Sequence, residues 1–135
     1  MSNKIEAQKN AGQAFMQINK DKPGVIELPE GIQYEILKEG TGAQPLITDK
    51  IKAHYKGALL DGKEFDSSFK INQPFTAPLR SLIRGWQIAI PLIKEGSHWR
   101  FWIPSDLAYG DRGAGADIPG GATLMFEVEL LQVIK

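Results

Sequence analysis

The chain has 135 residues, 16 basic and 16 acidic side chains, and no cysteine. This length suits one domain, and 42% hydrophobic with 24% charged residues is the composition of a globular protein rather than a disordered or fibrous one. A net charge of zero without a basic cluster argues against a nucleic-acid partner. The lack of cysteine excludes thiol catalysis, disulfide bonds and thiolate metal sites.

The N-terminal segment is polar, and Lys4–Asn19 predicts a helix because it is rich in Ala, Gln, Lys and Glu. Its apolar side chains are sparse, so we expect residues 1–22 to form a helical tail with a partly exposed face, closed by Pro23 and Gly24. No secretory signal is visible, and no apolar run approaches the roughly 20 residues of a membrane-spanning helix. The cellular compartment stays undetermined.

Beyond the tail, alternating apolar and polar residues predict strands over 31–36, 50–57, 63–65, 98–103 and 123–133. One short helix is expected in this part, from Arg84 to about Ile90, because Pro91 lacks the amide hydrogen that a longer helix needs. That helix is apolar on most sides, so it should pack into the concave face of the sheet. The predicted fold is α+β: a bent antiparallel sheet of about five strands around one short helix, preceded by the helical tail.

Two groups of residues that invite a catalytic or cofactor hypothesis do not fit one. His54 and His98 both lie on the polar phase of a strand, which indicates solvated histidines rather than a catalytic pair or a metal site. The glycine-rich run Gly110–Gly121 lacks the Lys-Ser/Thr pair of a phosphate-binding loop, and Ile118 stands where a dinucleotide fingerprint needs glycine. We expect no metal and no cofactor, and a loop that carries Ile118 over the edge of a cavity.

Aromatic side chains fall on inward strand positions, at strand ends and at the start of the helix: Tyr55, Phe65, Phe75, Trp86, Tyr109 and Phe126. In the predicted fold such side chains converge between the sheet and the helix. The pattern leaves two interpretations open. One is a plain aromatic core, and the other is an apolar pocket with Trp86 as its floor and Asp66 and two tyrosine hydroxyls as its few polar groups.

Five motifs follow one another at compatible spacings: Ala53–Gly57, Asp61–Ser68, Ile83–Trp86, Leu107–Gly110 and Ala122–Leu131. Together they resemble the FKBP family of peptidyl-prolyl cis-trans isomerases, named for binding macrolides such as tacrolimus and rapamycin. The resemblance runs from about Val25 to the C-terminus and implies an isomerase domain over residues 23–135. It implies accelerated rotation of X-Pro bonds in protein folding, with proline-containing polypeptides as partners and macrolides as inhibitors.

The resemblance also implies roles for individual residues. The catalytic residues would be Tyr55, Asp66, Tyr109 and Phe126. The residues that bind substrate or macrolide would be Phe65, Phe75, Leu82, Ile83, Trp86 and Ile118. Among these, Tyr109 would donate its hydroxyl to a substrate carbonyl, Leu82 and Ile83 would offer main-chain groups, and Ile118 would close the rim.

Ile103–Gly115 and the tail segment Phe15–Lys20 resemble the bacterial macrophage-infectivity-potentiator type of this family. In that type the helix before the isomerase domain leads back to an N-terminal dimerisation module. The present sequence begins inside that helix, so we expect it to be a monomer, whereas a longer parent protein would dimerise through the missing module.

Three positions depart from the pattern of well-known eukaryotic members. Ile71, beside Lys70, stands where a basic residue can pair with the aspartate; Ala114 replaces a histidine; and Pro91 lies at the helix end. Two other functions stay open. The pocket could hold proline segments without turnover, as in a binding or chaperone module, or the Lys4–Asn19 helix could serve assembly in a structural domain.

Overall fold

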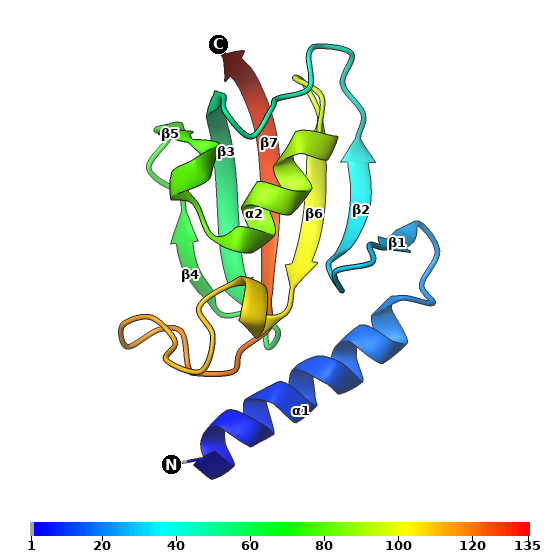
Figure 1. The fold of residues 1–135 in the computed structure, drawn as a ribbon, viewed down its shortest axis with the longest axis vertical. Coiled ribbons are helices and arrows are strands. Elements are labelled where there is room, and N and C mark those ends of the chain that lie inside the picture. Colours follow the sequence, from blue (N-terminus) through cyan, green and yellow to red (C-terminus); the bar gives the residue numbers. More distant parts are fainter. Residues whose placement is uncertain (1) are drawn as a thin grey trace.

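The computed structural model describes residues 2–135, with side chains from residue 4 onward. Within these residues seven strands form one antiparallel sheet, and two α-helices and three short 3-10 turns complete the fold (Figure 1). The strands are β1 (Val25–Glu27), β2 (Gln33–Lys38), β3 (Lys50–Leu59), β4 (Glu64–Ser67), β5 (Phe75–Pro78), β6 (His98–Ile103) and β7 (Leu124–Ile134). The helices are α1 (Ser2–Asn19) and α2 (Arg84–Ala89), with turns η1 (Leu79–Ser81), η2 (Ile90–Leu92) and η3 (Ser105–Leu107).

The strand order is β1-β2-β6-β7-β3-β4, with β5 also paired to β3. Strand β3 therefore organises one side of the sheet. It pairs with β7 along its whole length, with β5 near its start and with β4 near its end. Strands β4 and β5 both pair with the edge of β3 that faces away from β7, so the chain between them, residues 68–74, turns back along that edge (Figure 1).

Helix α2 crosses the concave face of the sheet and supplies the centre of the core (Figure 1). Ala89 and Ile90 are fully buried and Trp86 is 5% exposed. They pack with inward side chains of the long strands, among them Ile51, Phe101 and Val128, which are at most 1% exposed. The expected packing of a short apolar helix into a bent antiparallel sheet is confirmed.

Alternation located the longer strands well and missed the short ones. The prediction for 98–103 coincides with β6, and those for 50–57 and 123–133 fall on β3 and β7. Strands β1 and β5 were not expected, so the sheet has more strands than predicted. They have three and four residues, too few to show a period-2 pattern.

Pro91 stops α2 without interrupting the helical course of the chain. The α-helix ends at Ala89, and Pro91 lies in the second position of η2, which follows directly. A proline is tolerated there because the first residues of a helical turn need no amide partner. In the described part of the chain, no helix combines the length and the apolarity needed to cross a membrane.

Helix α1 is attached to the sheet more firmly than the expected tail. Asn19 is 1% exposed, and its Nδ2 donates to Oε1 of the fully buried Gln33 at 2.8 Å. Gln33 Nε2 in turn donates to the Met16 carbonyl at 2.8 Å and to Glu27 Oε2 at 2.9 Å. A buried amide with all of these partners is a specific join between the last turn of α1 and β2. Sparse apolar residues gave no sign of it.

Replacing Gln33 by Met tests the strength of this join. The variant keeps the side-chain volume but leaves Asn19 Nδ2 and the Met16 carbonyl without the partner they have in the folded chain. We expect a loss of about 1–3 kcal/mol in the free energy of unfolding, measured by urea denaturation. Gln132→Met is the matched control, because Gln132 is an exposed strand residue and its replacement should change stability by less than about 0.5 kcal/mol. Equal stabilities of the two variants would contradict the assigned role of Gln33.

Candidate functional site

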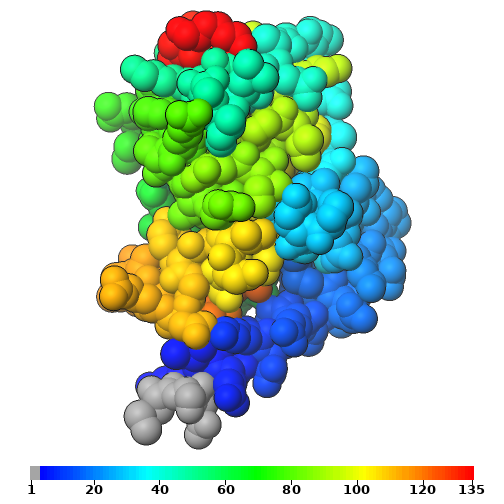
Figure 2. Space-filling model, viewed as in Figure 1, coloured from blue at the N-terminus to red at the C-terminus, as the bar shows by residue number. Residues whose placement is uncertain are grey.

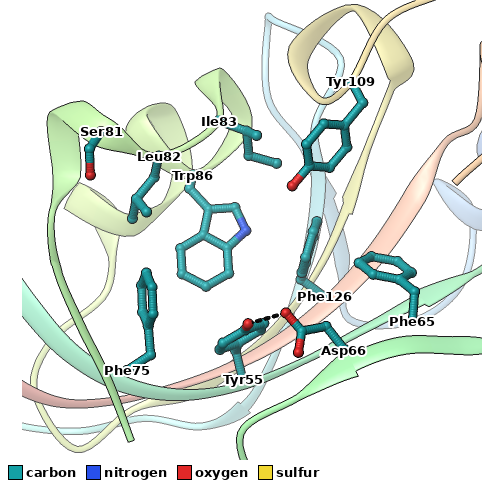
Figure 3. Close-up of a pocket in the computed structure, with 10 residues that line it drawn as sticks. All are labelled: Tyr55, Phe65, Asp66, Phe75, Ser81, Leu82, Ile83, Trp86, Tyr109 and Phe126. Carbon is teal, nitrogen blue, oxygen red and sulfur yellow. Dashed lines mark hydrogen bonds between the residues drawn. The ribbon is translucent and has the colours of Figure 1, made fainter. Parts of the chain in front are cut away.

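A cavity of about 330 Å³ opens between α2, the β4–β5 edge of the sheet and the loop after β6 (Figure 3). Most of its wall is aromatic or aliphatic. The lining residues are Tyr55, Phe65, Asp66, Phe75, Ser81, Leu82, Ile83, Trp86, Tyr109 and Phe126. The aromatic pattern left a plain core and a pocket open. The structure contains a pocket at this place.

The Trp86 indole forms the centre of the cavity wall and is held edge-on by its neighbours (Figure 3). Its ring centroid lies 5.5 Å from those of Tyr55 and Phe126, with interplanar angles of 84° and 89°. Phe75 approaches it at 6.2 Å and 81°. Edge-to-face contacts of this kind are favourable for aromatic pairs, so the indole is fixed by packing and its free face is turned to the cavity.

A second pair of rings, Phe65 and Phe126, packs at 5.8 Å and 88° on the other side of the cavity. Their approach depends on Gly57, because a Cβ at that position would lie 2.6 Å from the Phe65 ring and 2.9 Å from the Phe126 ring. Gly57 is therefore required for packing. The sequence places it in a motif without revealing this reason.

Three polar side chains of the cavity, Tyr55, Asp66 and Tyr109, face one another. The Tyr55 hydroxyl donates a hydrogen bond to the Asp66 carboxylate, and the Tyr109 side chain, 38% exposed, directs its hydroxyl toward the same space (Figure 3). Burial, and then the hydrogen bond to Asp66 and its negative charge, raise the pKa of Tyr55 far above the ordinary tyrosine value. Burial and then the charge of Asp66 also raise the pKa of Tyr109. Both phenols therefore stay neutral at physiological pH.

In the described part of the chain, one main-chain donor just before α2 has no hydrogen-bond partner, and it belongs to a residue that lines the cavity. The Leu82 carbonyl accepts from Gln87 Nε2 at 2.7 Å, and the Ile83 carbonyl accepts from the N–H groups of Trp86 and Gln87 at 3.0 and 3.1 Å. Leu82 N–H donates to the Leu79 carbonyl at 3.1 Å. Among the described residues, Ile83 N–H has no such partner. Of the main-chain groups expected from Leu82 and Ile83, the Ile83 amide is the one left for a bound molecule.

Two residues near the cavity were missed by sequence reasoning. Ser81 lines the wall, with its hydroxyl donating to the Pro78 carbonyl at 2.8 Å. Gln87, on α2, ties the wall to the helix through the Leu82 carbonyl. No pattern marks either residue, because single polar side chains beside a motif look like ordinary surface positions.

Ile118 does not lie where it was expected. It is 7% exposed, belongs to the core and is absent from the cavity lining. A pair of hydrogen bonds between its main chain and that of Ala114, at 2.9 and 3.1 Å, folds the loop back on itself. This tight turn draws the apolar side chain inward to the core, where its burial is favourable, rather than over the rim.

The structure settles the surroundings of Asp66. Ile71 is 68% exposed, and Lys70 pairs with Glu64 at 3.2 Å rather than with Asp66. The hydrogen-bond partner of the Asp66 carboxylate in this chain is the Tyr55 hydroxyl. A phenol supplies a hydrogen bond without a positive charge, so Asp66 has a neutral donor rather than an ion-pair partner among the described residues.

The two histidines are more engaged than the solvated side chains that were expected. His54 Nδ1 lies 2.9 Å from Ser68 Oγ and its ring stacks on Phe69, while His98 Nε2 lies 3.2 Å from Glu127. Both are on the face of the sheet away from the cavity. Among the described residues no cluster of three or more histidine or acidic side chains could hold a metal ion.

Comparison with known proteins identifies the family of the chain. The family model for FKBP-type peptidyl-prolyl cis-trans isomerases matches residues 42–131, and the model for the domain amino terminal to such isomerases matches residues 1–36. The peptidyl-prolyl cis-trans isomerase Mip of Coxiella burnetii is 44% identical over 90% of this chain and 53% of its own length.

Solved structures show the same relationship. A peptidyl-prolyl cis-trans isomerase from Pseudomonas syringae superimposes with a TM-score of 0.90 at 43% identity, over 96% of each chain. FkpA from Escherichia coli gives 0.94 at 34% identity, over 98% of this chain and 62% of that one. The chain spans 53–57% of the length of two curated relatives, Mip of Coxiella burnetii and the outer membrane protein MIP of Legionella longbeachae. With a matched family model over residues 42–131, the chain belongs to the FKBP-type peptidyl-prolyl cis-trans isomerase family.

Proposed function

We propose that this chain binds proline-containing segments in the aromatic cavity and accelerates rotation about the X-Pro bond. The observation that carries the proposal is the cavity itself: an apolar, aromatic wall around Trp86 with one unpaired amide, Ile83 N–H, at its edge. Such a site can enclose a proline ring and hold the chain beside it. Family membership supports the same reaction.

The chemistry needs no nucleophile, because no covalent bond is made or broken. The barrier of about 18–20 kcal/mol reflects the partial double bond of the amide, and twisting removes that resonance. The twisted amide has a less polar carbonyl than either planar form, so transfer from water into an apolar cavity favours it. Binding the twisted state more tightly by about 1.4 kcal/mol accelerates rotation about tenfold.

The polar cluster orients the substrate in this proposal. Tyr109 donates its hydroxyl to a substrate carbonyl, and Ile83 N–H binds a second one across the cavity. Asp66 accepts the hydrogen bond that holds Tyr55 in place, and burial together with the Asp66 charge raises the pKa of both phenols, so that each is a donor. Phe126 closes the wall over the twisting bond, while Phe65, Phe75 and Leu82 shape the apolar space around the ring.

The same cavity would bind macrolides of the rapamycin and tacrolimus type in place of substrate. Relaxation of a cis Ala-Leu-Pro-Phe peptide, followed with and without rapamycin, tests both parts of the proposal. We expect acceleration over the uncatalysed time of about 10–100 s, and its suppression by rapamycin. Rapamycin binding without acceleration would instead establish a proline-binding module without turnover. Acceleration that rapamycin leaves unchanged would contradict the macrolide assignment.

Trp86→Leu tests the floor of the cavity. Loss of the indole removes its contacts with Tyr55 and Phe126 and should weaken rapamycin binding at least about tenfold, or about 1.4 kcal/mol, by calorimetry. Trp99→Leu is the matched control. Trp99 is equally buried, at 4% exposed, but it packs on Tyr34 and Phe101 and does not line the cavity. Equal affinities of the two variants would refute the placement of the site.

Asp66→Asn tests the electrostatic role of the carboxylate. Removing the negative charge makes the phenolates of Tyr55 and Tyr109 easier to form, so their pKa values should fall, while burial keeps them above the ordinary tyrosine value. Titration by phenolate absorbance measures this shift, and Asp61→Asn, in the β3–β4 turn, is the control. The stability that the neutral phenols contribute is present below pH 10.0 and is lost as the pH rises toward their folded-state pKa values. Unchanged tyrosine titration in Asp66→Asn would contradict the role.

A further inference from the structure

Helix α1 lies against the loop that carries Tyr109. In Figure 1 the helix runs below the sheet, and the loop between β6 and β7 lies directly above its first turns; Figure 2 shows their atoms in contact. The less exposed positions of this part of the helix are Ile5, Lys9 and Gly12, which share one face at spacings of four and three residues. We call these three residues the bracing face of α1, and residues 108–123 the Tyr109 loop.

The contact between them is close because both sides carry glycine. A Cβ at Gly121, where φ is +82°, would lie 2.7 Å from the Ile5 carbonyl oxygen and 3.1 Å from Lys9 Cγ. A Cβ at Gly12 would lie 2.2 Å from Thr123 Oγ1. The helix backbone therefore packs directly on the loop. The Lys9 ammonium adds an ion pair with Asp111 at 2.8 Å.

One hydrogen bond links this contact to the residue beside Tyr109, and a second one holds that residue in place. Gly121 N–H, beneath Ile5, donates to the Gly110 carbonyl at 2.9 Å. Gly110 is the next residue after Tyr109, and its own N–H donates to the Ser105 carbonyl at 2.8 Å. The Tyr109 hydroxyl lies in the cavity (Figure 3). From the bracing face to the residue beside Tyr109 there is thus one packed contact and one hydrogen bond.

The far end of the helix is also held. The buried amides of Asn19 and Gln33 join its last turn to β2, so α1 is anchored at the sheet and at the loop. Phe15 adds a contact with Trp102 between these ends, at 6.4 Å between ring centroids. A helix with two anchors resists the rotation that would let the loop move away.

We propose that Ile5, Lys9 and Gly12 are positioning residues of the isomerase site, which act by bracing the Tyr109 loop. They do not touch the cavity: Ile5 and Lys9 act on Tyr109 through Gly121 and Gly110, and Gly12 acts through its contact with Thr123 in the same loop. This inference rests on the proposed function. It makes α1 part of the working isomerase, in contrast to a tail that only connects the domain to another module.

The test compares variants of the whole 135-residue chain. Ile5→Asp places a charge on the glycine contact and should lower kcat/KM for the proline peptide about tenfold, because small displacements of orienting groups are costly. Ala7→Asp is the matched control, with the same new residue on the exposed side of the same turn. Lys9→Glu should lower kcat/KM by at most about fivefold, as for an exposed ion pair, and Lys9→Glu with Asp111→Lys should restore it.

Hydrogen exchange of the Gly121 and Gly110 amides provides a readout that does not depend on activity. Both amides should exchange faster in Ile5→Asp than in the unchanged chain or in Ala7→Asp. Unchanged exchange overturns the brace, and faster exchange with unchanged kcat/KM overturns its role in positioning. If the unchanged chain accelerates no X-Pro rotation, the proposed function fails, and exchange alone then decides whether α1 braces the loop. If Ile5→Asp does not fold, the charge exchange between Lys9 and Asp111 decides: failure to restore kcat/KM overturns the proposal.

Discussion

Gly85, at the start of α2, lies so close to β6 that a Cβ there would be 2.5 Å from Ile103 Cγ2. The absence of a side chain lets the helix rest directly on the sheet, and this contact sets the depth at which Trp86, the next residue, enters the core. Gly57 does the same for Phe65 and Phe126 on the opposite wall. An added methyl group would press on Ile103 at Gly85 and on the two rings at Gly57, and close-packed interiors tolerate such insertions poorly. The shape of the cavity therefore depends on two glycines, one that lets α2 approach Ile103 and one that leaves room for the Phe65 and Phe126 rings.

A strand could be predicted from the sequence only where its alternating pattern was long enough. The period-2 alternation of His98–Ile103 predicted β6 residue for residue, whereas β1 and β5 were too short to be detected. Trp102 shows a second limit. It stands on the polar phase of β6, yet it is only 7% exposed, because Phe15 of α1 covers that face. Trp102 on the polar phase is visible in the sequence, but only the structure shows that it contacts α1.

In the candidate site, too, some residues could be placed from periodic patterns and others could not. Side chains that come from strand phases or from the helix start, such as Tyr55, Phe126 and Trp86, lie around one cavity, and those phases are visible in the sequence. Ile118 does not, because its position depends on a hydrogen-bonded turn with Ala114 that leaves no periodic signal. Ser81 and Gln87 were missed for a related reason, since their roles arise from main-chain carbonyls whose positions no side-chain pattern reveals.

Helix α1 shows why weak hydrophobicity is a poor guide to attachment. Besides the apolar contacts of Ile5 and Phe15, the helix is held by a glycine, a lysine and a buried asparagine at Gly12, Lys9 and Asn19, none of which a search for an apolar stripe would select. Each contact is specific in direction: a backbone approach, an ion pair and an amide pair. Apolar packing alone would let the helix slide along the sheet, whereas these contacts fix both its register and its tilt. Because its last turn is fixed to β2 by Asn19 and Gln33, the first turns of α1 can hold the Tyr109 loop in place.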